Sequence, residues 1–256
     1  MRTMETTKYL KQQAKQGDAD ALFRLGHRLA FGRSRPRPTD WPAVLEFWKH
    51  AADLGHERAM FYLGVCYEHG NGFVQDLTQA LQWYEKAAEL GHEVAMYNLA
   101  FSYRNGDGVP QDHEKMRFWL VKAAKLGDAA SQRDLGWCYH EGVGVPLDYA
   151  AAVRWYRAAA RQGDTKAQYN LGLSYLEGDG VAVSERWARH WLGKAAQQGY
   201  RKAKARLRRL VGTKQDLDAD LDAEYREMAQ DTVREAEALE WAEGTLMTQE
   251  ELNAVL

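Results

Sequence analysis

Apolar residues recur along much of the chain at the three- and four-residue spacing of an amphipathic helix. Ala59, Leu63 and Tyr67 form one such stripe, and a second stripe runs through residues 80–88. The sequence Gly-Asn-Gly at 70–72 lies between the two stripes. Glycine favours a tight turn there because it adopts positive φ without steric strain. The pattern therefore predicts two antiparallel helices joined by a short loop.

Residues at the ends of these helices carry capping signals. Asp76 stands just before the second stripe, where its carboxylate can accept hydrogen bonds from the first backbone N–H groups of a helix. His56 and His92 stand at the start of first helices, where other repeats have aspartate, and we interpret both as helix-start residues. Gly64 lies in the middle of a first helix and predicts close approach by a neighbouring helix.

The two-helix pattern recurs with a period of 36 residues. A fixed period between about 20 and 50 residues indicates stacked supersecondary units. Since one helix pair cannot bury its own apolar stripes, we predict an all-α fold, a right-handed α-solenoid of antiparallel helix pairs. The positions that repeat in phase are Gly55, Gly91, Gly127, Gly163 and Gly199; Leu63, Leu99, Leu135, Leu171 and Leu207; Tyr67, Tyr103, Tyr139 and Tyr175; and Trp83, Trp119, Trp155 and Trp191.

Together these positions resemble the Sel-one-like repeat (SLR) family, relatives of the tetratricopeptide repeats. The resemblance covers residues 17–210, as five full repeats and the first helix of a sixth. The first repeat departs from the pattern, with two extra loop residues and Phe47 in the tryptophan column. We expect residues 1–16 to form a helical lead-in and residues 211–256 to form an acidic, amphipathic helical cap. The resemblance implies a bacterial-type protein-interaction scaffold and names no particular partner.

Composition narrows the class of protein. Apolar residues make up 45% of the chain and charged residues 27%, which excludes wholesale disorder. The two cysteines, Cys66 and Cys138, are too few for a disulfide scaffold and are expected to be reduced, partly buried thiols. No apolar run approaches the ~20 residues of a membrane span, and no secretory signal is visible. We therefore expect a cytoplasmic protein with no membrane partner.

No motif in the sequence points to catalysis, a metal or a cofactor. The Gly-x-Gly pairs lack the preceding strand and the third glycine of a dinucleotide-binding fingerprint, so we interpret them as turns. His-Glu dipeptides begin at 56, 92, 113 and 140, but none has the second histidine four residues later that a zinc-protease helix needs. We expect no enzyme activity, no cofactor and no small-molecule substrate; a hydrolase-type enzyme is the remote alternative.

The net charge of −2 conceals a division along the chain. Residues 213–256 contain thirteen acidic and three basic residues, and six basic residues lie directly before them in 201–209. A basic run can bind nucleic acid. We expect instead that an acidic helix from Asp216 pairs with the run and caps the last apolar face. A solvated basic face and a partner-binding or self-blocking tail are the alternatives.

Residues on the side of the first helices that does not face the core are candidates for binding a partner. By resemblance to tetratricopeptide arrays, this side lines a concave groove. Aromatic residues and arginine recur there, which is the composition of binding hot spots. The alternative is that these rings pack against one another between repeats. The candidate partner-binding residues are Phe61, Val65, Tyr97, Phe101, Arg104, Arg133, Trp137, His140, Tyr169 and Leu173.

The sequence therefore predicts a non-enzymatic scaffold or adaptor that holds a protein partner in its groove. One alternative follows from the resemblance, because SLR proteins also act as immunity proteins that block secreted antibacterial toxins of the type VI kind. The acidic segment after 213 would then occupy a basic cleft of the toxin. The identity of the partner is not predicted.

Overall fold

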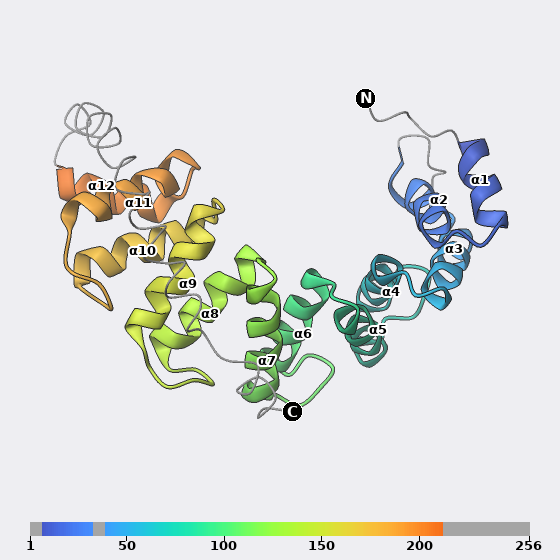
Figure 1. Cartoon of the computed structure of the whole chain (residues 1–256), viewed down its shortest axis with the longest axis horizontal. Coiled ribbons are helices and arrows are strands. Elements are labelled where there is room, and N and C mark those ends of the chain that lie inside the picture. Colours follow the sequence, from blue (N-terminus) through green and yellow to red (C-terminus); the bar gives the residue numbers. More distant parts are fainter. Residues whose placement is uncertain (1–6, 33–38, 212–256) are drawn as a thin grey trace. The chain divides into compact units, whose positions relative to one another are not determined.

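The computed structural model describes residues 7–32 and 39–211 of the chain (Figure 1). Within these residues the chain forms twelve helices and no strand, which confirms the predicted all-α repeat fold. The predicted acidic cap, its helix from Asp216 and most of the long loop of the first repeat lie outside the described residues. The helices are α1 (Thr7–Lys15), α2 (Ala19–Phe31), α3 (Trp41–Asp53), α4 (Glu57–His69), α5 (Leu77–Glu89), α6 (Glu93–Asn105), α7 (His113–Lys125), α8 (Ala129–Glu141), α9 (Tyr149–Arg161), α10 (Thr165–Glu177), α11 (Glu185–Gln197) and α12 (Arg201–Val211).

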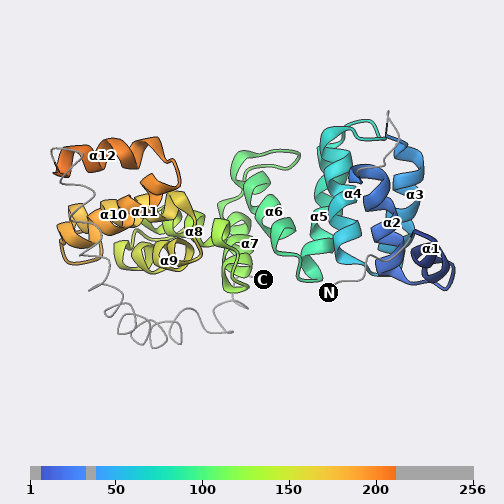
Figure 2. The same cartoon turned by 90° about the horizontal axis from the view of Figure 1, so that it is seen from above.

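The chain divides into two compact units after Asp112, and each is described by itself. Unit 1 contains α1 to α6 and unit 2 contains α7 to α12. Within each unit, every helix packs against the next helix in sequence, as Figure 2 shows for α2 to α5 and for α8 to α11. From α2 on, the even-numbered helices are the first helices of the repeats and the odd-numbered ones are the second helices.

The leucine column of the first helices forms the centre of the core. Leu63 and Leu135 are 0% exposed, and the other members of the column are almost as well buried. Burying one leucine side chain stabilises the fold by about 1.5–3 kcal/mol. The predicted close approach at Gly64 is also confirmed, because a Cβ atom there would lie 2.6 Å from the ring of Tyr84 on α5. Only a residue without a side chain lets that ring lie against the helix.

Helix starts are capped as predicted. The Asp76 carboxylate accepts a hydrogen bond from the Gln79 backbone N–H at 3.0 Å. His56 and His92 cap α4 and α6 in the same way, because each Nδ1 accepts a hydrogen bond from the backbone N–H three residues later, at 3.3 and 3.2 Å. An imidazole that caps in this way has no proton on Nδ1. Both histidines are therefore helix-start residues, as expected.

The two glycines of each Gly-x-Gly pair have different structural roles. The first glycine ends the first helix in the left-handed conformation, as Gly70 does with φ of 71°. The second packs against the second helix of the preceding repeat: a Cβ atom on Gly72 would lie 2.7 Å from the Trp41 Cβ atom on α3. The sequence pattern predicts the turn but does not reveal this second contact.

Candidate functional site

On the outward side of the first helices, the first column of equivalent repeat positions consists of Phe23 and the candidate residues Phe61, Tyr97, Arg133 and Tyr169. In unit 1, the Phe61 ring stacks on the ring of His92, with centroids 4.5 Å apart and planes within 16° of parallel. Phe23 stacks in the same way on His56, with centroids 4.7 Å apart. Each ring thus contacts the N-cap residue of the first helix in the next repeat. In unit 1, these two members of the first column connect successive repeats.

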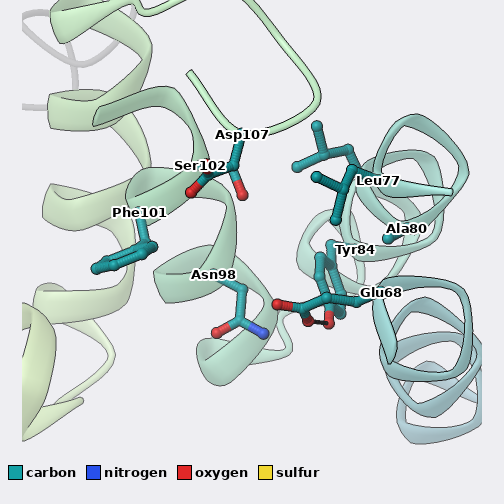
Figure 3. A pocket seen from close by; sticks show the side chains of 9 residues that line it. Glu68, Leu77, Ala80, Tyr84, Asn98, Phe101, Ser102 and Asp107 are labelled. Carbon is teal, nitrogen blue, oxygen red and sulfur yellow. Dashed lines mark hydrogen bonds between the residues drawn. The ribbon is translucent and has the colours of Figure 1, made fainter. Parts of the chain in front are cut away.

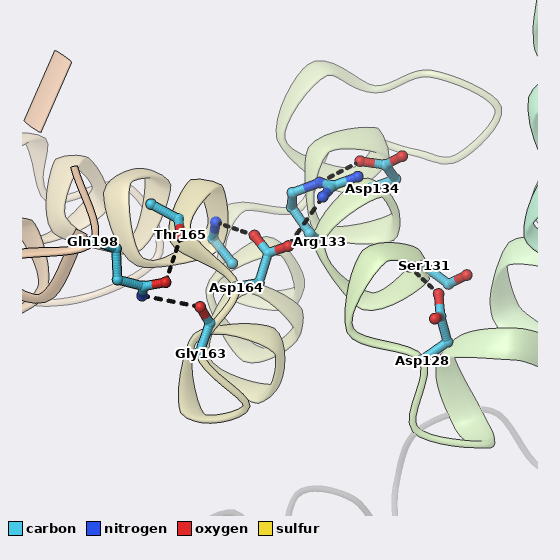
Figure 4. Close-up of polar contacts among 9 residues, drawn as sticks. Asp128, Ser131, Arg133, Asp134, Gly163, Asp164, Thr165 and Gln198 are labelled. Carbon is cyan, nitrogen blue, oxygen red and sulfur yellow. Dashed lines mark hydrogen bonds and ion pairs between the residues drawn. The ribbon is translucent and has the colours of Figure 1, made fainter. Parts of the chain in front are cut away.

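Unit 2 makes the same connection with other chemistry (Figure 4). Arg133 Nη1 lies 3.0 Å from the carboxylate of Asp164, which is the N-cap residue of α10. Arg133 Nε also donates to the neighbouring Asp134 at 2.7 Å. One repeat later, the rings of Tyr169 and Tyr200 meet edge to face at 5.1 Å, and Tyr200 directly precedes α12. Arg133 and Tyr169 therefore also connect repeats.

A glutamine ladder in unit 2 strengthens the same connections. Gln162 Nε2 donates to the backbone oxygen of Gly127 and to Gln132 Oε1, each at 2.8 Å. Gln198 repeats this pattern with Gly163 and Gln168, at 3.0 and 2.8 Å. This ladder was not predicted from the sequence. Its signal is the recurrence of both glutamines 36 residues apart.

The second column consists of His27, Val65, Phe101, Trp137 and Leu173. Phe101 on α6 is 42% exposed, whereas the other four are half-buried. Trp137 lies against the apolar cluster of α9, α10 and α11. This column therefore contains the most exposed of the ten candidate residues.

The third column consists of Glu68, Arg104, His140 and Leu176, one helical turn further along the first helices. The Arg104 guanidinium lies over the Phe101 ring, 4.6 Å from its centroid, so that a cation and an aromatic face stand together on α6. In unit 2, His140 Nδ1 lies 2.9 Å from the carboxylate of Glu141. His140 Nε2 lies 3.7 Å from the carboxylate of Asp179.

A pocket of about 130 Å³ opens beside Phe101 in unit 1 (Figure 3). Side chains of α4, α5, α6 and the loop after α6 line it. The Tyr84 hydroxyl donates a hydrogen bond to the Glu68 carboxylate within it. Burial, together with this hydrogen bond, raises the pKa of Tyr84, which keeps the phenol protonated. The lining residues are Glu68, Leu77, Ala80, Leu81, Tyr84, Asn98, Phe101, Ser102 and Asp107.

Cys66 and Cys138 are buried thiols outside any disulfide, as expected from the sequence. Burial raises the pKa of Cys66 to about 12, so that this side chain is a neutral thiol rather than a reactive thiolate at neutral pH. Across the described ranges, no cluster of three or more His, Cys, Asp and Glu side chains is arranged to hold a metal ion. No helix in that part of the chain has the length and apolarity needed to cross a membrane.

The basic run of 201–209 lies on α12, where most of its charged side chains are exposed. Arg206 lies 3.6 Å from the carboxylate of Glu177 on α10. The expected pairing of this run with residues beyond 213 falls outside the described residues.

A family model described as "Sel1 repeat" matches residues 19–40, 57–92, 94–128, 129–164 and 165–200. The chain belongs to the Sel1 repeat family. This result confirms the resemblance found in the sequence. Sel1 repeat proteins are generally protein-interaction scaffolds and mostly not enzymes.

Two solved Sel1-type structures are similar to this chain over most of its length. The c5321 protein, a protective antigen of uropathogenic Escherichia coli with an SLR fold, is 33% identical with a TM-score of 0.78. That match covers 88% of this chain and 49% of the other. A Sel1 repeat protein from Oxalobacter formigenes is 34% identical with a TM-score of 0.73, and the match covers 80% of this chain and 59% of the other.

A curated relative matches over a shorter segment. The DAP3-binding cell death enhancer 1 of Rattus norvegicus is 36% identical over 62 residues, which is 23% of this chain and 12% of that protein. The chain thus spans only a small part of this relative and about half of the E. coli chain.

Proposed function

We propose that this Sel1 repeat chain is a non-enzymatic scaffold that binds a protein partner through outward side chains of its first helices. The proposal assigns the binding surface of unit 1 to Val65, Phe101 and Arg104. In unit 2 it assigns binding to Trp137, His140 and Leu173. The first-column residues Phe61, Arg133 and Tyr169 would then hold the helices in position rather than supply most of the binding energy.

The observation that carries this proposal is the pair of Phe101 and Arg104. Phe101 is 42% exposed, and the guanidinium of Arg104 covers part of its ring. Exposed aromatic and arginine side chains that stand together are enriched at the centres of protein interfaces. The family supports the same function, and the rat relative is named for binding DAP3.

Site-specific photo-crosslinking tests this proposal in the full chain. A photoreactive benzoyl-phenylalanine replaces Phe101 in one variant and Val74 in a matched control, since Val74 is 89% exposed on the loop after α4. We expect irradiation in cells to join a defined protein to position 101 and not to position 74. Equal adducts at both positions, or none at position 101, would contradict the proposed surface.

The immunity-type function expected as an alternative stays a prediction. It depends on the acidic segment after residue 213, which lies outside the described residues. A partner identified by the crosslink at position 101 separates the two functions, because the immunity hypothesis requires that partner to be a toxin.

A further inference from the structure

The pocket beside Phe101 in unit 1 combines two carboxylates with apolar walls. Glu68 lies on α4, and Asp107 lies in the loop after α6 on the opposite side of the pocket (Figure 3). Leu77 and Phe101 supply apolar surface to the lining, and both are partly exposed. The pocket therefore offers hydrogen-bond acceptors on two sides together with apolar contacts.

Neither carboxylate is paired with a basic side chain in the part of the chain that the structure describes. Glu68 accepts a hydrogen bond from the Tyr84 hydroxyl, and Asp107 accepts one from the Asn105 side chain at 3.1 Å. Both of these donors are neutral. The nearby Arg104 forms no ion pair with either carboxylate, since its guanidinium lies over Phe101 and its Nε donates to the Asn105 side chain. Among the described residues of unit 1, none thus forms an ion pair that neutralises the negative charge of the pocket.

The matched position in unit 2 is built differently. The period of 36 residues places His140 where unit 1 has Glu68, and Asp179 where it has Asp107. There, His140 Nε2 lies 3.7 Å from the Asp179 carboxylate, and its ring packs edge to face on Tyr149 at 5.2 Å. An imidazole, which becomes cationic on protonation, thus lies against the aspartate in unit 2.

The repeat that contains Glu68 differs from the later repeats at this position. Arg104, His140 and Leu176 occupy it in the following repeats, and Glu68 is the one acid among the four. An acidic residue at this place puts a second carboxylate into a pocket that already contains one. Two like charges in one pocket are unfavourable unless a cation lies between them.

We infer that this pocket binds a lysine or arginine side chain of the protein partner, an inference that rests on the proposed function. The ammonium or guanidinium group takes the place between Glu68 and Asp107, where unit 2 has its own imidazole. The aliphatic stem lies along Leu77 and Phe101, as long basic side chains do on apolar surfaces. A charge-assisted hydrogen bond to each carboxylate makes a charged side chain bind more tightly than a neutral one of the same shape.

Chemical-shift titration of the full chain with small probes tests the inference. The probes are the N-acetyl amides of arginine and lysine, and the control is the N-acetyl amide of citrulline, which has the shape of arginine without its charge. We expect arginine or lysine, at roughly millimolar concentration, to shift the backbone amides of Phe101, Ser102 and Asp107. Citrulline is expected to bind about 10-fold more weakly or worse.

Variants locate the binding site. Asp107→Asn, a change in an exposed loop, and Glu68→Gln, which keeps an acceptor for Tyr84, are each expected to weaken arginine binding about 10-fold. Asp179→Asn is the matched control in unit 2 and leaves binding unchanged. Glu68→His rebuilds the unit 2 arrangement and is expected to abolish binding. Circular dichroism confirms that each variant is folded.

Two results would overturn the inference. One is equal binding of arginine and citrulline; the other is arginine binding that both carboxylate variants leave intact. Either result leaves the proposed scaffold function standing if the crosslink at position 101 still captures a protein. Loss of that crosslink, with arginine binding retained, would instead contradict the proposed function while the pocket itself remains a site for basic groups.

Discussion

Units 1 and 2 connect successive repeats at the same position, by ring contacts in unit 1 and by an ion pair as well as a ring contact in unit 2. In unit 1 the connection is made by stacked rings, Phe23 on His56 and Phe61 on His92. In unit 2 the equivalent step from α8 to α10 is the ion pair of Arg133. The glutamine ladder differs in the same direction, since glutamines at 132 and 162 stand where unit 1 has methionine and leucine at 60 and 90.

The repeat therefore determines where two successive repeats contact each other, and the residue types at that position determine the chemistry of the contact. The partner in each case is the residue before or at the start of the next first helix, and its type changes with the first-column residue: histidine faces phenylalanine, and aspartate faces arginine. An aromatic residue at this position therefore indicates a connection between repeats. Under the proposed function, partner binding falls to the second and third columns.

The largest expected effect is one that the two units share. Leu63→Ala and Leu135→Ala each remove a side chain that is 0% exposed. We expect each change to lower the free energy of unfolding by about 2–5 kcal/mol, because the lost burial and the cavity left behind add together. Urea unfolding followed by circular dichroism measures the loss. If the loss at one leucine lies within this range and the loss at the other lies outside it, the two units differ in the packing of their cores.

The next effect is a pH dependence that originates in unit 2. Burial, and to a lesser extent the charge of Lys194, lowers the pKa of His190 from 6.5 to about 4. The folded chain therefore disfavours protonation of His190. The contribution of His190 to the free energy of unfolding is fully present above pH 6.5 and is lost as the pH decreases toward 4. The expected loss is about 3 kcal/mol.

Unfolding experiments at several pH values, on the wild type and on His190→Phe, check this prediction. The variant keeps a ring between Trp187 and Trp191, which both contact His190 edge to face. It is expected to show a shallower decrease in stability below pH 6.5. An identical pH profile for the two proteins would show that His190 does not cause the dependence.

Salt is expected to separate the two kinds of connection. Arg133→Met removes the ion pair between Arg133 and Asp164. The two side chains are only 15% and 16% exposed, respectively. The expected cost is about 1.5–3 kcal/mol at low salt, and the difference from the wild type decreases in 1 M salt because screening weakens the pair. Phe61→Leu is the control from unit 1, and the cost of this change should not decrease with salt. Salt-independent costs at both positions would contradict the comparison.

The smallest effect concerns the glutamine ladder. Gln162→Leu removes two donated hydrogen bonds and leaves Gln132 Oε1 without that donor, at an expected cost of about 1 kcal/mol. The second change, Gln132→Met, introduces the residue found at position 96 in unit 1. We expect the double variant to be more stable than the sum of the two single losses predicts. Strict additivity would show that the two glutamines act independently.

Much of the fold follows from local sequence signals. The caps at His56 and Asp76 and the turn at Gly70 depend on neighbouring residues alone, so their spacing predicts them. The leucine column is equally predictable, because the 36-residue period and the helical stripe place it on one buried face.

The candidate site was harder to predict, because the exposure of its side chains depends on which of them the next repeat covers. Helical geometry places Phe61 and Val65 alike on the side away from the core, and it does not show that His92 lies against Phe61. The pairing of histidine with phenylalanine and of aspartate with arginine was a usable signal in the sequence. The division after Asp112 has no such signal, since the repeat pattern continues through it.

The most direct test of the distinction between the columns compares Phe61→Ala with Phe101→Ala by denaturant unfolding. Phe61 stacks between repeats, whereas Phe101 is 42% exposed. The account predicts a loss of about 2 kcal/mol for Phe61→Ala and less than about 0.5 kcal/mol for Phe101→Ala. Equal losses, or a larger loss for Phe101→Ala, would contradict the assignment of the first column to connecting repeats and of the second to binding.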